Sequence, residues 1–193
     1  MFEAKPSSRA DLKSGTLYAV SGEAEWIYYG QVTPDKRVGF FRRRDRAVAL
    51  PSEILAAPIM AVVGVGYPSI TRALRSGTWS KLGRFDLASS LNEPWAMVQW
   101  AVGTLVVGVL DGDAEYDTRV DDPVIQNMEI IASWDAEQHI AARLTADFGK
   151  EDAAWHIGGP VWRERGVKEE YARRFPDAPW HQLPPDWVPT DIS

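Results

Sequence analysis

Residues 15–46 read GTLYAVSGEAEWIYYGQVTPDKRVGFFRRRDR and contain three runs rich in aromatic and β-branched residues. The runs cover 16–20, 25–32 and 38–43, and the turn-like segments SGEAE and TPDKR separate them. Connections this short join neighbouring antiparallel strands, because parallel strands need a long crossover. The stretch therefore predicts a three-stranded antiparallel meander.

Beyond this meander the chain continues with strands and short helices. PIMAVVGVG, at 58–66, is too apolar for a half-exposed strand, so we expect it in the interior of a sheet. In the helix expected at 67–77, Ser69 serves as the N-cap and Gly77 as the stop. Further strands are expected at 79–87, 96–102 and 104–110, a helical turn at 50–55, and helices at 135–149 and 166–175.

The length of 193 residues fits one α+β domain. We expect a polar arm at 1–14 and a β-rich core at 15–110 that forms a twisted antiparallel sheet or a small barrel with a few short helices. The extension at 111–193 holds helices and a Pro- and Trp-rich tail. It is expected to pack on the core and to cover the apolar run 98–110, which needs cover on both faces.

Composition argues against several classes of protein. The chain has no cysteine, which excludes disulfides and cysteine-based zinc sites and fits the cytoplasm. Its net charge of −6 disfavours nucleic-acid binding and permits attraction to a basic protein. The apolar stretch 95–110 is too short to span a membrane, and 1–15 lacks the apolar region of a signal peptide. We therefore expect a cytoplasmic protein without a membrane or nucleic-acid partner.

Two segments share the pattern W-H-x-x-x-P-x-W, namely WHIGGPVW at 155–162 and WHQLPPDW at 180–187. Trp buries a large ring and Pro reduces the entropy lost on ordering, so the pair can fasten the C-terminal chain to the core. The alternative is a metal or catalytic site that uses His156 and His181. Fastening is favoured, because neither segment has the carboxylates of a metal site apart from Asp186. It predicts that four side chains are mostly buried against the β-rich half: Trp155, Trp162, Trp180 and Trp187.

Residues 111–122 read DGDAEYDTRVDD. The carboxylates alternate like the ligands of a calcium loop, but Tyr116 takes the position that needs glycine and Asp122 the position that needs glutamate. A calcium site is therefore disfavoured, which leaves a solvated loop or an acidic recognition surface that steers a basic partner. The candidate partner-binding residues are Asp111, Asp113, Glu115, Asp117, Asp121 and Asp122.

A basic cluster ends the third run, where FFRRRDR at 40–46 brings together Arg42, Arg43, Arg44 and Arg46. We interpret it as charge that guards the edge of a sheet. Phosphate binding is the alternative, and the negative net charge gives it no support.

Several segments between 13 and 110 form a recognisable series: SGTLYAV, WIYYGQV, a strand containing GFF, LPSEIL and ITRALRSGTWSKLGRFDL. The series resembles the bacterial immunity-protein family numbered twenty-six, whose members neutralise toxin domains of polymorphic toxin systems. The resemblance is carried by Gly15, Tyr29, Gly30, Gln31, Gly77, Trp79 and Gly83. It implies a β-rich fold, no catalysis and no cofactor, and it transfers no partner-binding residue.

Three functions are compatible with these patterns, and the third is that of a structural or scaffold component. The first is a non-catalytic immunity protein that binds a cognate toxin domain and occludes it. The second is a small metal-dependent hydrolase that uses His139, His156 and His181 with the carboxylates of 111–122. His139 itself lies between Asp135 and Arg143 at helical spacing, which is typical of a solvated helix face.

Overall fold

The three runs of the N-terminal segment form three neighbouring antiparallel strands in the computed structural model. They are β1 (Thr16–Ser21), β2 (Ile27–Val32) and β3 (Val38–Asp45). In the register of the meander, Tyr18 lies opposite Gly30, which in turn lies opposite Phe40. The meander predicted from the sequence is confirmed.

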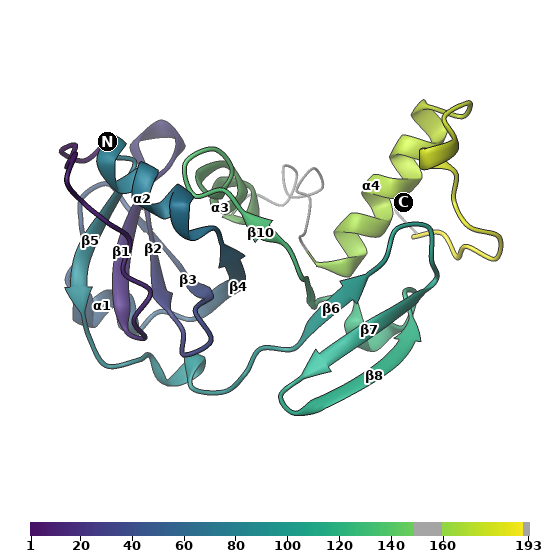
Figure 1. The fold of residues 1–193 in the computed structure, drawn as a ribbon, viewed down its shortest axis with the longest axis horizontal. Helices are drawn as coiled ribbons and strands as arrows, with labels where there is room; N and C mark the ends of the chain where they lie inside the picture. Colours follow the sequence, from purple (N-terminus) through teal and green to yellow (C-terminus); the bar gives the residue numbers. More distant parts are fainter. Residues whose placement is uncertain (149–159, 191–193) are drawn as a thin grey trace. The chain divides into compact units, whose positions relative to one another are not determined.

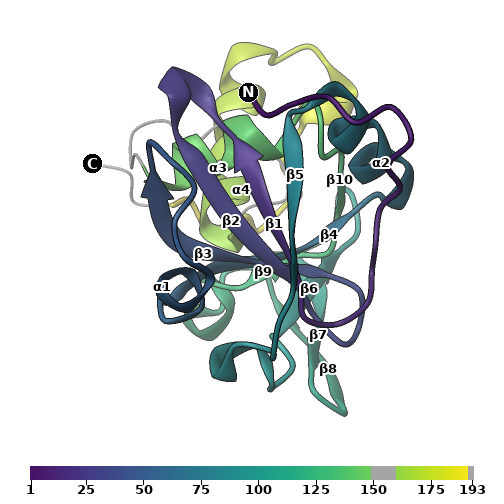
Figure 2. The same ribbon diagram turned by 90° about the vertical axis from the view of Figure 1, so that its left-hand side faces the viewer.

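Three more strands complete a six-stranded sheet in the order β10-β4-β3-β2-β1-β5 (Figure 1). Figure 2 shows β2, β1 and β5 of this sheet side by side. β5 (Trp79–Arg84) pairs with β1, and β4 (Ile59–Val65) lies between β3 and the short β10 (Ser133–Trp134). The interior position predicted for the 58–66 run is therefore confirmed. Because β10 runs parallel to β4, the sheet is mixed rather than purely antiparallel.

Short helices accompany this sheet: α1 (Pro51–Leu55), α2 (Tyr67–Ser76) and α3 (Ile140–Phe148). α2 stops at Gly77, whose φ of 79° is the left-handed conformation that glycine tolerates. Its N-cap is Gly66 rather than Ser69. The Ser69 hydroxyl instead donates to the Gly66 carbonyl and accepts from the Ala136 N–H, at 2.6 and 2.9 Å. The helix start predicted at Ser69 is thus three residues late.

A second, four-stranded sheet has the order β8-β7-β6-β9. Its strands are β6 (Met97–Trp100), β7 (Val106–Asp111), β8 (Ala114–Arg119) and β9 (Glu129–Ile130), and α4 (Val161–Arg174) follows later in the chain (Figure 1). Single 3-10 turns are formed by η1 (Glu23–Glu25), η2 (Ser89–Leu91), η3 (Pro123–Ile125) and η5 (Pro179–His181). Two mixed sheets with a few helices make an α+β fold, as the sequence predicts.

The structure describes residues 1–148 and 160–190, which group into two compact units. The first consists of residues 1–93 and the chain from 132 through α3, and the second holds residues 94–131 and the chain from 160 onward. A division at residue 110 does not exist, because β7 runs through this position and pairs with β8. Folding of the whole chain as one domain stays a prediction.

The apolar run 98–110 is not covered on both faces. In β7, Val107 and Val109 are buried, whereas Val106, the first residue of the strand, is 54% exposed. β7 is therefore a half-buried strand with the usual alternation of a sheet that has one solvated face. No helix within the described ranges is long and apolar enough to cross a membrane.

The C-terminal tail is fastened to α4 by one carboxylate. Glu169 accepts a hydrogen bond from the Trp187 indole N–H at 2.9 Å, and also from the Thr190 N–H and hydroxyl at 2.7 and 2.6 Å. The Trp187 ring stacks on Trp100 of β6, with centroids 6.1 Å apart. Arg165 of α4, which is buried, donates to the Val188 carbonyl at 2.6 Å. The fastening interpretation therefore describes Trp187 well.

The burial predicted for the other tryptophans of the paired motif is wrong at two positions. Trp162 is 44% exposed and Trp180 is 75% exposed. Trp162 lies in the first turn of α4, where Val161 and Arg165 occupy the buried side of the helix, so its own side chain points away. Trp155 and His156 lie outside the described residues. The repeated sequence pattern does not produce a repeated environment.

We predict that Glu169→Gln destabilises the second unit. The amide keeps one acceptor oxygen, so at least one hydrogen bond from the tail is lost and the free energy of unfolding falls by about 1–3 kcal/mol. Glu170→Gln is the matched control, because the neighbouring carboxylate pairs with the exposed Arg173 of the same helix, and it should change stability by less than about 0.5 kcal/mol. Chemical denaturation followed by tryptophan fluorescence measures both. Equal stabilities of the two variants would contradict the role of Glu169 in fastening the tail.

We also predict that the first unit loses stability in alkali. Burial raises the pKa of both Tyr18 and Tyr29 to about 12 from 10.0. Between these values the unfolded chain releases the phenolic protons while the folded chain keeps them, so stability falls as pH rises by about 1.4 kcal/mol per pH unit for each tyrosine.

Denaturation curves from pH 9 to 12 measure this slope. Tyr18→Phe and Tyr29→Phe should each flatten it, whereas Tyr67→Phe, at a tyrosine that is 46% exposed, should leave it unchanged. An unchanged slope in both buried variants would show that other groups cause the alkaline loss.

Candidate functional site

The acidic segment is a β-hairpin and not the loop that the sequence suggests. β7 ends at Asp111, β8 begins at Ala114 opposite it, and Gly112 and Asp113 form the turn between them. Gly112 has a φ of 61°, and glycine in this conformation at the first of two turn positions is characteristic of a hairpin turn. The run of carboxylates prevents recognition of the strand from the sequence, because aspartate is uncommon in strands. The loop prediction is wrong for this reason.

Four of the six candidate carboxylates are exposed and uncompensated. Glu115 and Asp117 lie on β8 opposite Leu110 and Gly108, so they project from the face that does not carry the buried Val107 and Val109. β8 is the last strand of its sheet (Figure 1). No ion pair or hydrogen bond joins a side chain of this group to another residue in the described ranges: Asp111, Asp113, Glu115 and Asp117. We call these four residues the acidic hairpin.

The other two carboxylates have structural partners. Asp121 forms an ion pair with Arg119 at 2.9 Å. Asp122 accepts from the Thr118 hydroxyl at 2.7 Å and from the Val124 N–H at 2.9 Å, and thereby caps η3. The Thr118 hydroxyl and the Val124 N–H hold the pKa of Asp122 below its usual value. Asp121 and Asp122 therefore hold structural contacts besides their candidate role in partner binding.

The hairpin also exposes apolar side chains: Tyr116 on the face of Val109, and Val106 on the opposite face, which carries Glu115 and Asp117. The Tyr116 side chain, in the middle of β8, is 42% exposed, and Val106 opposite Arg119 is more exposed still. Aromatic side chains with a polar end are enriched at protein interfaces. Tyr116 is a functional candidate that sequence reasoning missed, because it was weighed only as a mismatch in a calcium loop.

The histidines do not form a metal centre within the described residues. His139 is exposed just before α3 in the first unit, and His181 belongs to the second unit. The His181 ring stacks on Tyr171 at 5.1 Å and packs against Phe175 at 5.4 Å, which is the environment of a fastening residue. Across residues 1–148 and 160–190, no three His, Asp or Glu side chains gather as metal ligands would.

The surroundings expected for His139 are also different. Arg143 does not lie on a solvated helix face, since it is 1% exposed. Its guanidinium lies 4.6 Å from the centre of the Trp134 ring, and its Nε pairs with Asp147 at 3.1 Å. A buried arginine in this setting holds α3 to β10. The solvated-face interpretation fails because the helix turns this position inward.

The arginine cluster begins within β3 and ends one residue after it. β3 is an interior strand for only part of its length. β4 pairs with β3 as far as Phe41, whereas β2 continues alongside to Asp45. The charged residues thus extend past the last pair with β4, although β3 as a whole is not the edge strand that the sequence suggests. Arg43 projects from one face and pairs with Asp45 and Glu53, at 2.8 and 3.0 Å.

The three alternate arginines stack on two aromatic rings. Arg44 lies 4.4 Å from the centre of the Trp26 ring and 4.9 Å from that of Phe148. Arg46 lies 3.8 Å from the Trp26 ring, and Arg42 lies 5.8 Å from the Phe148 ring. Cation–π attraction orients these guanidinium groups. We call this set of five residues the arginine ladder.

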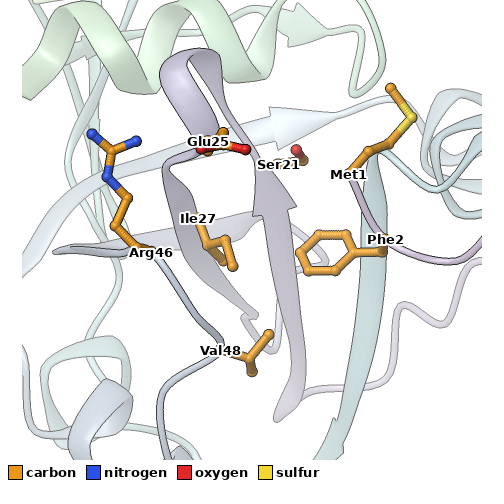
Figure 3. Close-up of a pocket in the computed structure, with 7 residues that line it drawn as sticks. All are labelled: Met1, Phe2, Ser21, Glu25, Ile27, Arg46 and Val48. Carbon is orange, nitrogen blue, oxygen red and sulfur yellow. The ribbon is translucent and has the colours of Figure 1, made fainter.

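A pocket of about 310 Å³ adjoins the ladder in the first unit, and Arg46 belongs to both. In Figure 3 the side chains of Phe2, Ile27 and Val48 point into one space. The complete lining is Met1, Phe2, Ser21, Glu25, Ile27, Arg46 and Val48. The turn at its rim contains Ala24 and Glu25 with φ values of 48° and 61°, which are costly for residues other than glycine and recur at functional sites.

Comparison of the chain with models of known protein families, with curated proteins and with solved structures finds no significant match. The resemblance to the immunity-protein family thus rests on the sequence segments themselves.

We predict that Asp122 stabilises the second unit and that the acidic hairpin does not. Asp122→Ala removes the acceptor for Thr118 and Val124 and should lower Tm at pH 7, whereas Asp111→Ala should leave Tm unchanged. The pKa of Asp122 is lowered from 3.8 in the folded chain, so its contribution is present above that pH and is lost as pH falls through the folded value. Thermal unfolding from pH 7 to 2 measures the difference, which should vanish in acid. Equal Tm values at pH 7 would contradict the assignment.

Proposed function

We propose that the chain is a non-catalytic immunity protein that binds a cognate bacterial toxin domain in the cytoplasm and occludes it. The observation that carries the proposal is the acidic hairpin, which exposes four carboxylates without a partner among the described residues on the last strand of a sheet. The resemblance of residues 13–110 to the immunity family supports the same function.

The hairpin favours a partner with a basic surface. Clustered carboxylates create a negative potential that raises the rate of encounter with cationic surfaces. A basic surface is what a toxin that acts on nucleic acid needs, because it must approach phosphates. An inhibitor that presents carboxylates to such a surface would compete directly with the substrate of the toxin.

The edge position of β8 supplies contacts besides charge. One side of β8 pairs with β7, and no described strand pairs with the other side. A partner can therefore form main-chain hydrogen bonds there, as in strand addition, while Tyr116 offers an aromatic anchor. A stable interface of about 1,600 Å² in total would need more surface than this hairpin, with the hairpin acting as its charged part.

The experiment neutralises the four carboxylates of the hairpin. The variant Asp111→Asn, Asp113→Asn, Glu115→Gln, Asp117→Asn is tested against any toxin domain that a neighbouring gene encodes, by rescue on co-expression and by binding kinetics in a salt series. We expect association to slow by about tenfold or more at low salt and its salt dependence to flatten, because charges of this kind act mainly on the association rate. Circular dichroism should show an unchanged fold.

The matched control removes four exposed carboxylates of the first unit: Glu3→Gln, Glu23→Gln, Asp86→Asn and Glu93→Gln. It changes the net charge equally and should keep the salt dependence of the parent chain. If the two variants slow association equally, the effect is one of net charge and the hairpin is not the interface. If the hairpin variant rescues as well as the parent and associates as fast, the proposal fails.

A further inference from the structure

We propose that the arginine ladder and its adjoining pocket bind an extended acidic peptide segment of a partner protein. Carboxylates at alternate positions of this segment pair with Arg42, Arg44 and Arg46, and an apolar side chain next to them fills the pocket. The site lies in the first unit and does not depend on the function proposed for the acidic hairpin.

The spacing of the three arginines matches an extended ligand. They alternate along the end of β3 and the residue after it, so successive guanidinium groups start about 6.8 Å apart along the backbone. Carboxylates on every second residue of an extended peptide repeat at the same distance. The ladder can thus pair with three such carboxylates in register, whereas contiguous carboxylates would point alternately toward it and away.

The guanidinium groups are oriented before any ligand arrives. Cation–π attraction to Trp26 and Phe148 restrains these side chains, and a guanidinium group can pair with a carboxylate through two N–H groups. No ion pair or hydrogen bond links these three side chains to a residue of the described chain. Arg43, which lies between them in sequence, differs because Asp45 and Glu53 already pair with it.

The pocket selects the side chain that lies beyond the carboxylates of the ligand. Its lining includes Arg46 and Val48, which lie on either side of Ala47 in the bend that follows β3. Phe2, Ile27 and Val48 give it apolar walls (Figure 3), while Glu25 at its rim repels a fourth carboxylate. An aromatic or large aliphatic side chain that follows the carboxylates of the ligand can therefore occupy the pocket.

Single-stranded nucleic acid also repeats its charges along an extended backbone, but two observations favour the peptide. Each aromatic ring already carries two guanidinium groups, so these rings are poorly placed to stack with bases. The net charge of −6 also repels a long polyanion, whereas a short acidic segment meets mainly the local field of the ladder.

The probe is a synthetic peptide with blocked ends that reads Glu-Thr-Glu-Thr-Glu-Thr-Phe, together with its reverse, because the direction of the bound strand is open. Isothermal titration calorimetry against the full chain at low salt measures binding. We expect at least one direction to bind, and a peptide of the same composition with its three glutamates adjacent to bind about tenfold more weakly. A thymidine oligonucleotide with three phosphates should bind more weakly than the alternating peptide.

The ladder variant is Arg42→Gln, Arg44→Gln, Arg46→Gln, and it should weaken binding of the alternating peptide by about tenfold or more. The matched control, Lys5→Gln, Arg9→Gln, Arg84→Gln, removes three exposed positive charges from the same unit and should bind within about twofold of the parent chain. If the glutamine variant does not fold, Arg→Lys at the same three positions retains the charges but loses the planar groups, and it should also bind more weakly.

The pocket is tested separately with Val48→Trp, at a side chain that is 47% exposed and therefore outside the core. This variant should abolish the advantage of the phenylalanine peptide over one that ends in alanine. Absence of binding by either peptide at millimolar concentration would overturn the proposal. If the ladder and control variants weaken peptide binding equally, net charge and not the ladder causes the binding. If the oligonucleotide binds more tightly than the peptide, the site is a nucleic-acid site.

Discussion

The first unit depends on the buried side chain of Trp79, which joins its sheet to the chain that returns after residue 131. Its ring packs against Tyr18 of β1 at 5.5 Å and against Phe40 of β3 at 6.2 Å, and its indole N–H donates to the Ala136 carbonyl at 3.0 Å. This hydrogen bond fixes the segment between β10 and α3. Since α3 ends at Phe148, the same contact indirectly positions one of the two rings of the arginine ladder. The candidate peptide site therefore depends on a core contact far away in sequence.

In both units, the charged side chains that stabilise the fold have hydrogen-bonding partners, whereas the candidate recognition charges have none among the described residues. Asp122, Glu169, Arg143 and Arg165 all have close hydrogen-bonding partners, and each holds a turn, a tail or a helix in place. The acidic hairpin and the ladder arginines have no ion-pairing partner among the residues described. Exposed charges cost little to leave unpaired in water, so selection for stability alone neither requires nor removes them. The alternation of Glu115 with Asp117 on β8, and of Arg42 with Arg44 on β3, is what suggests a ligand with an extended backbone.

The sequence predicted the meander, the strands β4 to β7 and the stop of α2 at Gly77, because these rest on the local periodicity of apolar residues and on backbone preference, but it did not predict β10. It failed where tertiary context decides. The Asp111–Ala114 hairpin was hidden by its carboxylates, and the exposure of Trp162 and Trp180 depends on which side of a helix or turn faces the core. Arg42, Arg44 and Arg46 were visible as a cluster, but Phe148 lies about a hundred residues away, and no local pattern connects them. The one local sign that Arg42, Arg44 and Arg46 share a face was their position at every second residue, with Arg43 between the first two.

The carboxylates of the acidic hairpin disfavour pairing of the exposed β8 edge with a second copy of the chain. An unpaired edge invites strand addition by any extended chain, including a second copy. Two copies of β8 placed edge to edge would bring Glu115 and Asp117 near their own counterparts, and like charges across a strand pair are destabilising. A strand that carries Lys or Arg at alternate positions meets no such repulsion. The same carboxylates that disfavour pairing with a second copy would also favour the proposed basic partner, and this preference would depend on charge sign rather than on a fitted pocket.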